Sequence, residues 1–363
     1  MSPPSTPPPL KMAILDDYQN LSTPHFSSIP ATQLQTTHFP TTLPPPPASN
    51  AALIARLHPY HIICAMRERT PLPAAVLAHL PNLRLILTTG TRNQAIDLDA
   101  CAARGIAVAG TPSDRPAPPA TPKTTQHLFA LILALTNNIP RDNNNTLLFP
   151  SPGAGGPHWQ APSPVLSTQL AGKTFAVLGF GKLGTAAARV AWFGFGMRVV
   201  AWSASLTQAD ADERAAGVGM PRGAVEVVAS KAEAFERADV LSLQYVLGER
   251  SRGMVGRAEL ALLKRGAVFV NTARAGLVDE DALFEVLCQG RIRGAALDVW
   301  WREPMDQMDR WRVTRWGEEG RSALVATPHT AYVTEETMEA WWRLTKENLE
   351  RWLRGEDVVS RLA

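Results

Sequence analysis

The chain has 363 residues, of which 45% are hydrophobic and 19% are charged. This length predicts two domains of about 100–200 residues each, and this composition is typical of globular proteins. The net charge of +3 is small, and no run of basic residues is interleaved with aromatic ones, which argues against a nucleic-acid partner.

Signals for secretion, membrane insertion and metal binding are absent from the sequence. The three cysteines, Cys64, Cys101 and Cys288, lie far apart and suggest neither a disulfide framework nor a zinc motif. The N-terminus, MSPPSTPPPL, lacks the basic and apolar regions of a signal peptide. The apolar run 128–135 is far shorter than the about 20 residues that span a bilayer. We therefore expect a cytoplasmic protein with no metal ion and no membrane partner.

The first third of the chain predicts a parallel sheet covered by helices, because apolar runs alternate there with helix-like stretches. A proline-rich tail at residues 1–10 is expected to be disordered. Strands are expected at 11–17, 61–66, 83–89 and 105–110, and helices at 50–58, 73–80 and 97–104. Residues 37–47 (THFPTTLPPPP) predict a surface loop.

Residues 111–122 (TPSDRPAPPATP) are too rich in proline for a helix or a central strand, and they predict a linker between domains. An apolar helix is expected at 124–137, an irregular loop at 149–164 and a long amphipathic helix at 334–354. Between the last two lie six apolar runs, namely TFAVLGF, MRVVAW, VEVVAS, DVLSLQ, AVFVNTA and GAALDVW. Six strands in this order predict a doubly wound nucleotide-binding sheet, so the expected fold class is α/β.

The first of these strands runs into a Gly-x-Gly-x-x-Gly turn. The turn consists of Gly179, Phe180, Gly181, Lys182, Leu183 and Gly184. Its first glycine allows a tight turn, the second lets the backbone approach a pyrophosphate, and the third allows close packing of strand and helix. The N–H groups at the start of the following helix attract phosphate. The pattern predicts a binding site for a dinucleotide.

The next strand of the series ends at Trp202 and is followed by Ser203. NAD-binding sheets carry an acid at this point, about 20 residues after the glycines, to bind the ribose hydroxyls. Ser203 would not repel the 2′-phosphate of NADP, yet no arginine follows it to attract that phosphate. The sequence therefore leaves NAD(H) and NADP(H) both open.

Three polar residues follow later apolar runs: Arg274 after AVFVNTA, Glu303 after GAALDVW, and His329 after residues 324–326. Ligands of open α/β sheets bind at the carboxyl ends of the strands, where we expect all three. Arginine binds carboxylates with two donors, and histidine exchanges protons near neutral pH. A carboxylate beside the histidine favours its charged form. This set suits the interconversion of a 2-keto acid and a 2-hydroxy acid.

Together these residues give the sequence a resemblance to the D-isomer-specific 2-hydroxyacid dehydrogenase family. The segments that carry it are GFGKLG, VNTARAGLVDEDAL, ALDVWWREP and TPHTAY, and it extends over residues 11–355. The resemblance implies a Rossmann-like cofactor domain at 123–330, and a smaller flavodoxin-like substrate domain formed by 11–122 and 331–363. It also implies an active-site cleft that closes by a hinge motion, and a homodimer.

The resemblance further implies roles for single residues. Arg274 would bind the carboxylate and carbonyl of the substrate, His329 would be the acid/base, and Glu303 would be its partner. The residues implied near the nicotinamide or its phosphates are Asp298, Thr272 and Thr125. The residues implied at the substrate are Gly90 and Thr91, through their backbone, and Arg67 and Arg69, which would hold a second anionic group. A solvated Arg-Glu-Arg turn is the alternative for the last two.

Some positions depart from the family's pattern. Gln244 stands where relatives often have histidine, Gln126 replaces an acid, and residues 305–322 lengthen the span before His329. The main hypothesis is hydride transfer to C2 of a small 2-keto acid. The alternatives are a dinucleotide-sensing, corepressor-like binding protein with little catalysis, and formate oxidation. Glu303 argues against the latter, because that branch pairs its histidine with glutamine.

Overall fold

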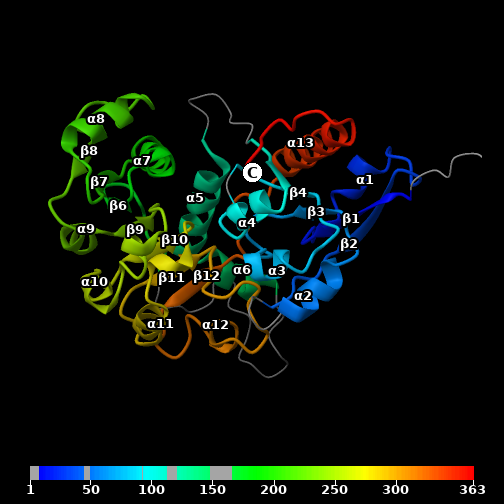
Figure 1. Ribbon diagram of the computed structural model, residues 1–363. Helices are drawn as coiled ribbons and strands as arrows, with labels where there is room; N and C mark the ends of the chain where they lie inside the picture. Colours follow the sequence, from blue (N-terminus) through cyan, green and yellow to red (C-terminus); the bar gives the residue numbers. More distant parts are fainter. Residues whose placement is uncertain (1–7, 45–49, 92, 113–120, 148–165) are drawn as a thin grey trace, which may run out of the picture. The chain divides into compact units, whose positions relative to one another are not determined.

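The computed structural model of the chain describes residues 8–44, 50–91, 93–112, 121–147 and 166–363 (Figure 1). Residues 1–7 of the predicted tail, 113–120 of the predicted linker and the whole predicted loop 149–164 lie outside these ranges. The described part forms two compact units. The first lies within Met1–Arg115 and Val333–Ala363, and the second lies within Pro116–Tyr332.

The first unit is built on a five-stranded parallel sheet with the order β2-β1-β3-β4-β5. The strands are β1 (Leu10–Leu15), β2 (Leu34–Phe39), β3 (Ile62–Ala65), β4 (Leu85–Thr88) and β5 (Ala107–Gly110). Strands β3 and β4 are buried over their whole length. Parallel strands covered on both faces read as continuous apolar runs, which is why the sequence predicts them.

Helices of this unit come from both ends of the chain. They are α1 (Thr23–Phe26), α2 (Asn50–Leu57), α3 (Ala74–Leu77), α4 (Leu98–Ala103) and α13 (Glu335–Leu353). Thr334 caps α13, since its side chain accepts a hydrogen bond from the Thr337 N–H. The fully buried Trp342 of α13 meets Phe26 edge to face, with ring centroids 6.2 Å apart. The C-terminal helix is therefore part of the first unit's core.

Two details predicted for this unit are wrong. Leu34–Phe39 is a strand, although part of it was expected in a loop, and β1 already begins at Leu10, inside the predicted tail. β2 lies at the edge of the sheet, and only Leu34 of its residues is buried. An exposed edge strand lacks the apolar run that identifies a central one.

The second unit contains a seven-stranded parallel sheet with the order β12-β11-β10-β9-β6-β7-β8. The strands are β6 (Thr174–Leu178), β7 (Arg198–Trp202), β8 (Val225–Val227), β9 (Val240–Leu243), β10 (Val268–Asn271), β11 (Gly294–Leu297) and β12 (Ala323–Ala326). The six predicted strands are confirmed, but the predicted number is one too small. The seventh strand, β12, is a short edge strand that is only partly buried.

Helices cover both faces of this sheet. They are α5 (Lys123–Thr136), α6 (Ile139–Leu147), α7 (Lys182–Phe195), α8 (Gln208–Ala216), α9 (Lys231–Arg237), α10 (Arg257–Ala261), α11 (Glu280–Cys288) and α12 (Arg310–Val313), with 3-10 turns η1 (Glu249–Ser251) and η2 (Ala275–Leu277). Alternate residues of β6 enter different cores: Phe175 packs with α5 and α7, whereas Ala176 packs with α9 and α11. Successive side chains of a strand point to opposite faces, so the sheet has a core on each side.

Among the described residues, no helix has both the length and the apolar character needed to cross a membrane. The doubly wound α/β architecture expected from the sequence is confirmed by the two parallel sheets.

Candidate active site

The carboxyl edge of the seven-stranded sheet collects the predicted cofactor and catalytic residues of the second unit. Gly179 follows β6, and Ser203 follows β7. Arg274, Glu303 and His329 follow β10, β11 and β12, which are neighbours in the sheet. Because the strands are parallel, their carboxyl ends share one edge. The order of the strands reverses between β9 and β6, and ligands of such sheets bind at that point.

The glycine turn is shaped by contacts that no side chain would permit. Gly179 has φ = 94°, and a Cβ on it would come within 2.5 Å of the Gln244 carbonyl oxygen. A Cβ on Gly184 would come within 2.0 Å of the Gly179 oxygen. In the described part of the chain, nothing lies within 4 Å of a Cβ built on Gly181. Gly179 and Gly184 thus close the turn, while Gly181 leaves its outer side accessible.

Helix α7 begins directly at this turn. Gly181 is its N-cap, and no side chain caps it. The first N–H groups of a helix have no partner within the helix and carry a partial positive charge. The Phe180 carbonyl is held by Arg214 Nη1 at 2.8 Å, which fixes the turn against α8. These features fit the diphosphate of a dinucleotide.

Two buried polar atoms nearby also lack a partner within the described residues. They are Thr125 Oγ1, in the first turn of α5, and Gln244 Oε1, directly after β9. The Gln244 amide nitrogen is engaged, because it donates to Ser242 Oγ and Thr272 Oγ1 at 3.1 and 3.2 Å. A buried acceptor without a partner costs free energy unless a ligand pairs with it. The residues present therefore suit a nicotinamide dinucleotide.

Ser203 lies at the end of β7 beside two aromatic rings. Trp202 stacks on Tyr245, with centroids 6.3 Å apart, and the Ala204 N–H lies 3.4 Å from the Tyr245 hydroxyl. The ring pair fixes the course of the chain after β7. Ser203 itself brings no charge to this strand end.

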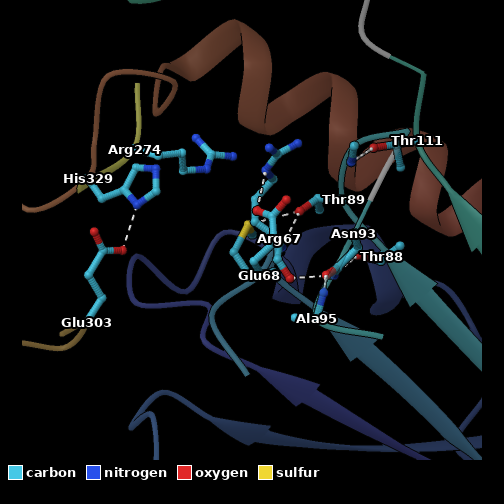
Figure 2. Close-up of polar contacts among 12 residues, drawn as sticks. Arg67, Glu68, Thr88, Thr89, Asn93, Ala95, Thr111, Arg274, Glu303 and His329 are labelled. Atoms are coloured by element: carbon cyan, nitrogen blue, oxygen red, sulfur yellow. Dashed lines mark hydrogen bonds and ion pairs between the residues drawn. The ribbon is translucent and has the colours of Figure 1, made fainter. Parts of the chain in front are cut away.

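Arg274 stands between β10 and the turn η2. Its Nη1 donates to the Ala273 carbonyl at 2.8 Å. Asn271, the last residue of β10, holds the loop: its Nδ2 donates to the Arg274 carbonyl, and its Oδ1 accepts from the Ala273 N–H, both at 3.0 Å. In Figure 2 the Arg274 guanidinium and the His329 imidazole project from their loops to the same side.

Glu303 and His329 form a direct pair (Figure 2). His329 Nδ1 lies 2.6 Å from Glu303 Oε2, and both side chains are partly exposed. The other carboxylate oxygen, Oε1, accepts from the Trp300 N–H at 2.8 Å. His329 has φ = 56°, a left-handed backbone conformation that costs roughly 1–3 kcal/mol in residues other than glycine. Such a conformation persists only where surrounding contacts enforce it.

Asp298 supplies those contacts. Its Oδ1 accepts from Thr327 Oγ1 at 2.7 Å and from the Thr330 N–H at 2.8 Å, and its Oδ2 accepts from the Ala331 N–H at 3.0 Å. His127 Nε2 lies 3.4 Å from Oδ1. Burial raises the pKa of this fully buried carboxyl, but these hydrogen bonds outweigh burial and lower the pKa below its ordinary value. Asp298 thus holds the His329 loop from inside the unit.

In the first unit, the predicted substrate residues lie at the carboxyl ends of β3 and β4 (Figure 2). The Arg67 N–H donates to Thr89 Oγ1 at 3.0 Å, and its Nε lies 3.4 Å from Glu68. The Gly90 N–H, predicted to meet the substrate carboxylate, instead donates to Thr111 Oγ1 at 2.8 Å. A Cβ on Gly90 would clash with the Arg67 guanidinium, so this glycine allows the arginine to pack against the turn.

Arg69 is held by contacts within the same unit. Its Nη1 donates to the Asp16 carbonyl at 3.0 Å, and its guanidinium lies 4.4 Å from the centre of the Tyr18 ring. The structure therefore gives Arg69 an internal role at the end of β1. A role toward an anionic substrate stays a prediction.

Sequence reasoning missed three residues that fix the loops of the predicted catalytic residues: His127, Trp300 and Thr327. His127 Nε2 lies 3.0 Å from Thr327 Oγ1, and the Trp300 indole donates to the Thr327 carbonyl at 2.9 Å. Trp300 and Thr327 lie within the signature segments ALDVWWREP and TPHTAY. No pattern in the sequence shows that these contacts form, because they join residues far apart in the chain.

A family model described as D-isomer specific 2-hydroxyacid dehydrogenase, NAD binding domain, matches residues 129–331. The chain belongs to this family. The matched range includes the glycine turn and the loops that carry Arg274, Glu303 and His329. The family model therefore supports a nicotinamide dinucleotide as the cofactor.

Relatives extend the similarity beyond this domain. D-3-phosphoglycerate dehydrogenase of Mycobacterium tuberculosis is 30% identical over 275 residues, which are 76% of this chain and 46% of that protein. The chain thus spans about half the length of the phosphoglycerate dehydrogenases it matches. Glyoxylate reductase of Korarchaeum cryptofilum is 29% identical over 291 residues, which are 80% of this chain and 79% of that protein.

A solved structure confirms the fold. The phosphoglycerate oxidoreductase from Vibrio cholerae has a TM-score of 0.76 and 29% identity, and the match covers 95% of this chain and 99% of that one. In the described part of our chain, no three His, Cys, Asp or Glu side chains are grouped so as to hold a metal ion.

Proposed function

We propose that this protein is an NAD(P)-dependent oxidoreductase that transfers a hydride between a nicotinamide and C2 of a small 2-hydroxy or 2-keto acid. The observation that carries the proposal is the Glu303–His329 pair, with 2.6 Å between Oε2 and Nδ1. The pair lies on loops that follow adjacent strands, and the next strand of the sheet leads into Arg274. The same sheet carries the glycine turn. Family membership supports the assignment.

The chain's own residues would handle the proton. A bound nicotinamide supplies or accepts the hydride. His329 Nδ1 is engaged by Glu303, so Nε2 is the atom that would give a proton to the keto oxygen, or take one from the hydroxyl in the reverse direction. The carboxylate fixes the tautomer and the orientation of the ring. The Trp300 N–H on Oε1 keeps that carboxylate oriented.

Arg274 would handle the substrate's negative charge. A guanidinium carries five N–H donors in a planar fork, which matches the geometry of a carboxylate. Asn271 holds the Arg274 backbone, so the side chain starts from a defined point. In the first unit, Thr91 and Arg67 are the residues we propose for the substrate, because the Gly90 amide already has an internal partner.

The choice of cofactor rests on Ser203. The matched family model is named for NAD. Position 203, however, holds a serine and not the acidic residue that would exclude the 2′-phosphate of NADP. We therefore propose that both NADH and NADPH bind, and both belong in every assay.

The test is a spectrophotometric assay with NADH and NADPH and a panel of 2-keto acids that includes glyoxylate and hydroxypyruvate. We expect loss of nicotinamide absorbance with at least one pair. His329→Ala should lower kcat by about 10²–10⁴-fold, the usual contribution of a general acid, while cofactor binding measured by calorimetry stays unchanged. His79→Ala is the matched control, because His79 is exposed and its Nδ1 lies 2.9 Å from the Ala75 carbonyl of its own helical turn.

One result would favour the alternative function. If NADH binds but every substrate is silent, and His329→Ala changes nothing, a dinucleotide-sensing binding protein explains the chain better. Absence of dinucleotide binding would contradict both functions. A homodimer and a cytoplasmic location are further proposals, to be checked by light scattering and by imaging of a tagged chain.

A further inference from the structure

Trp300 contacts Glu303 and the loop that leads into His329. Its backbone N–H donates to Glu303 Oε1 at 2.8 Å, and its indole Nε1–H donates to the Thr327 carbonyl at 2.9 Å. Thr327 lies two residues before His329, whose Nδ1 is 2.6 Å from Glu303 Oε2. These contacts close a ring that joins the loop after β11 to the loop after β12.

We propose that Trp300 is a positioning residue for the acid/base pair, acting through its indole N–H on the backbone that carries His329. The inference rests on the proposed function, since it assigns Trp300 to the same reaction. Trp300 would not touch the reacting atoms. It would set the distance and angle at which His329 meets Glu303.

The pair needs such support, because its own side chains are not packed in the core. The side chains of His329 and Glu303 are 28% and 35% exposed, so contacts of neighbouring residues matter for their positions. Asp298 binds Thr330 and Ala331 after His329 and the Thr327 hydroxyl before it, and Trp300 binds the Thr327 carbonyl. A displacement of about 1 Å at a catalytic group can lower a rate about 100-fold.

Trp300 is in turn fixed by an aromatic cluster, which we define as Phe284, Trp300, Trp301, Trp311 and Trp316. Trp311 lies at its centre and is 4% exposed. Its ring centroid is 5.8 Å from that of Trp300 at 66°, and 5.5 Å from that of Trp316 at 27°. Trp311 and Trp316 belong to residues 305–322, which lengthen the span before His329. The segment 305–322 therefore packs against Trp300 through Trp311.

A purely structural role for Trp300 predicts a different result. A comparison with Trp316 distinguishes the structural role from the positioning role. Trp316 belongs to the same cluster, and its Nε1–H also donates to a carbonyl, that of Trp311, at 2.9 Å. That bond stays within the 305–322 segment and reaches neither Glu303 nor the loop before His329. Phenylalanine at either position keeps an aromatic ring, and it removes the indole N–H together with part of the ring.

The experiment compares Trp300→Phe with Trp316→Phe in the full-length chain. We expect Trp300→Phe to lower kcat at least about tenfold while the KM for the cofactor is unchanged, since a small displacement of His329 affects the chemical step. Trp316→Phe should keep the wild-type kcat. Replacing Trp300 by benzothienylalanine, which keeps the size of the indole but has no N–H, should reproduce the loss if Trp300→Phe unfolds.

A second measurement does not require turnover. The Cε1–Hε1 signal of His329, assigned by its loss in His329→Ala, should broaden in Trp300→Phe, because the imidazole samples more than one position. It should stay sharp in Trp316→Phe. Equal kcat values and sharp signals in both variants would overturn the inference. If the wild type shows no turnover, the proposed function fails, and the signal alone still decides whether Trp300 holds His329 in place.

Discussion

Ser203 is the residue on which cofactor preference depends. It follows β7 with no charge of its own. We predict that Ser203→Asp raises the KM for NADPH tenfold or more and leaves the KM for NADH equal or lower. Two like charges about 4 Å apart repel by about 4 kcal/mol at an effective dielectric constant of about 20, and each 1.4 kcal/mol is a factor of about ten.

Steady-state kinetics with both cofactors measures this difference. Gln35→Asp, on the exposed edge strand β2 of the other unit, adds the same charge elsewhere and serves as the control. An unchanged KM for NADPH in Ser203→Asp would mean that the adenosine end of the cofactor does not lie at the end of β7.

Asp298 gives a second prediction, on stability. Asn keeps the shape of Asp. It presents an amide nitrogen, however, to some of the N–H and O–H groups that now donate hydrogen bonds to Asp298. Leaving buried donors unsatisfied costs about 1–3 kcal/mol each. We therefore expect Asp298→Asn to lower the free energy of unfolding at pH 7 by a few kcal/mol, as measured by urea denaturation.

The pH dependence of this loss follows from the pKa of Asp298. The pKa in the folded protein lies below the ordinary value of 3.8, so folding favours the ionised form. The ionised carboxylate then contributes stability at pH values above 3.8, and the contribution is lost as the pH falls through the lower, folded-state pKa. The gap between wild type and Asp298→Asn should therefore narrow in acid. Asp281→Asn, 81% exposed, is the control, and a gap independent of pH would refute the argument.

Of the single residues in the site, the sequence predicts some and not others. Arg274, Glu303 and His329 could be predicted because each follows an apolar run, and parallel topology alone brings such residues to one edge. Trp300 could not, because it acts on a backbone carbonyl that any residue would present at position 327. The internal partner of the Gly90 amide also depends on Thr111, which follows a different strand.

At the scale of helices and strands, two glycines of the β6–α7 segment are expected to have different roles, one in folding and one in cofactor binding. A Cβ on Gly184 would meet the Gly179 backbone oxygen at 2.0 Å, so strand and helix would have to separate. A Cβ on Gly181 meets nothing within 4 Å in the described residues, and Gly181 is the N-cap of α7, where we propose that the diphosphate binds. We predict that Gly184→Ala lowers Tm and cofactor binding together, whereas Gly181→Ala keeps Tm and weakens cofactor binding alone.

Differential scanning fluorimetry and calorimetry test this prediction. Gly194→Ala is the control in the same helix, because its Cβ would make an ordinary contact of 3.7 Å with Val190. Gly194 is the second-to-last residue of α7, and replacing a helical glycine by alanine usually adds stability, up to about 0.5–1 kcal/mol in mid-helix, so Tm should stay or rise. Unchanged cofactor affinity in Gly181→Ala would remove the diphosphate from this turn.

Elements also mark where sequence prediction stops. Strand β2 was not predicted, and β12 was recognised only as the apolar run 324–326 and not counted among the strands; both lie at sheet edges and are largely exposed or only partly buried. Central strands such as β4 and β10 could be predicted, because burial on both faces demands an unbroken apolar run. An edge strand pairs on one side only, so its sequence can be polar and is hard to distinguish from a loop.

At the scale of the whole molecule, the predicted cofactor site lies in one of the chain's two compact units. Every dinucleotide-binding feature described above lies within Pro116–Tyr332. A ligand that binds only the folded form adds about 2.7 kcal/mol of stability at 100 times its Kd, which slows exchange through global opening about 100-fold. We therefore predict that NADH slows hydrogen exchange of the amides of β6 and β9 and leaves those of β1 and β3 unchanged.

Hydrogen exchange with mass spectrometry measures both units in one sample, so each serves as a reference for the other. Strand β3 is buried over its whole length, as β6 is, and β1 is buried from its third residue on, so exposure of these residues cannot explain a difference between the sheets. Gly181→Ala should abolish the NADH effect on β6 without changing exchange in its absence. Equal slowing in both sheets would show that the two units open together or that NADH binds both. Slowing in β1 and β3 alone would place the cofactor on the first unit and contradict the prediction.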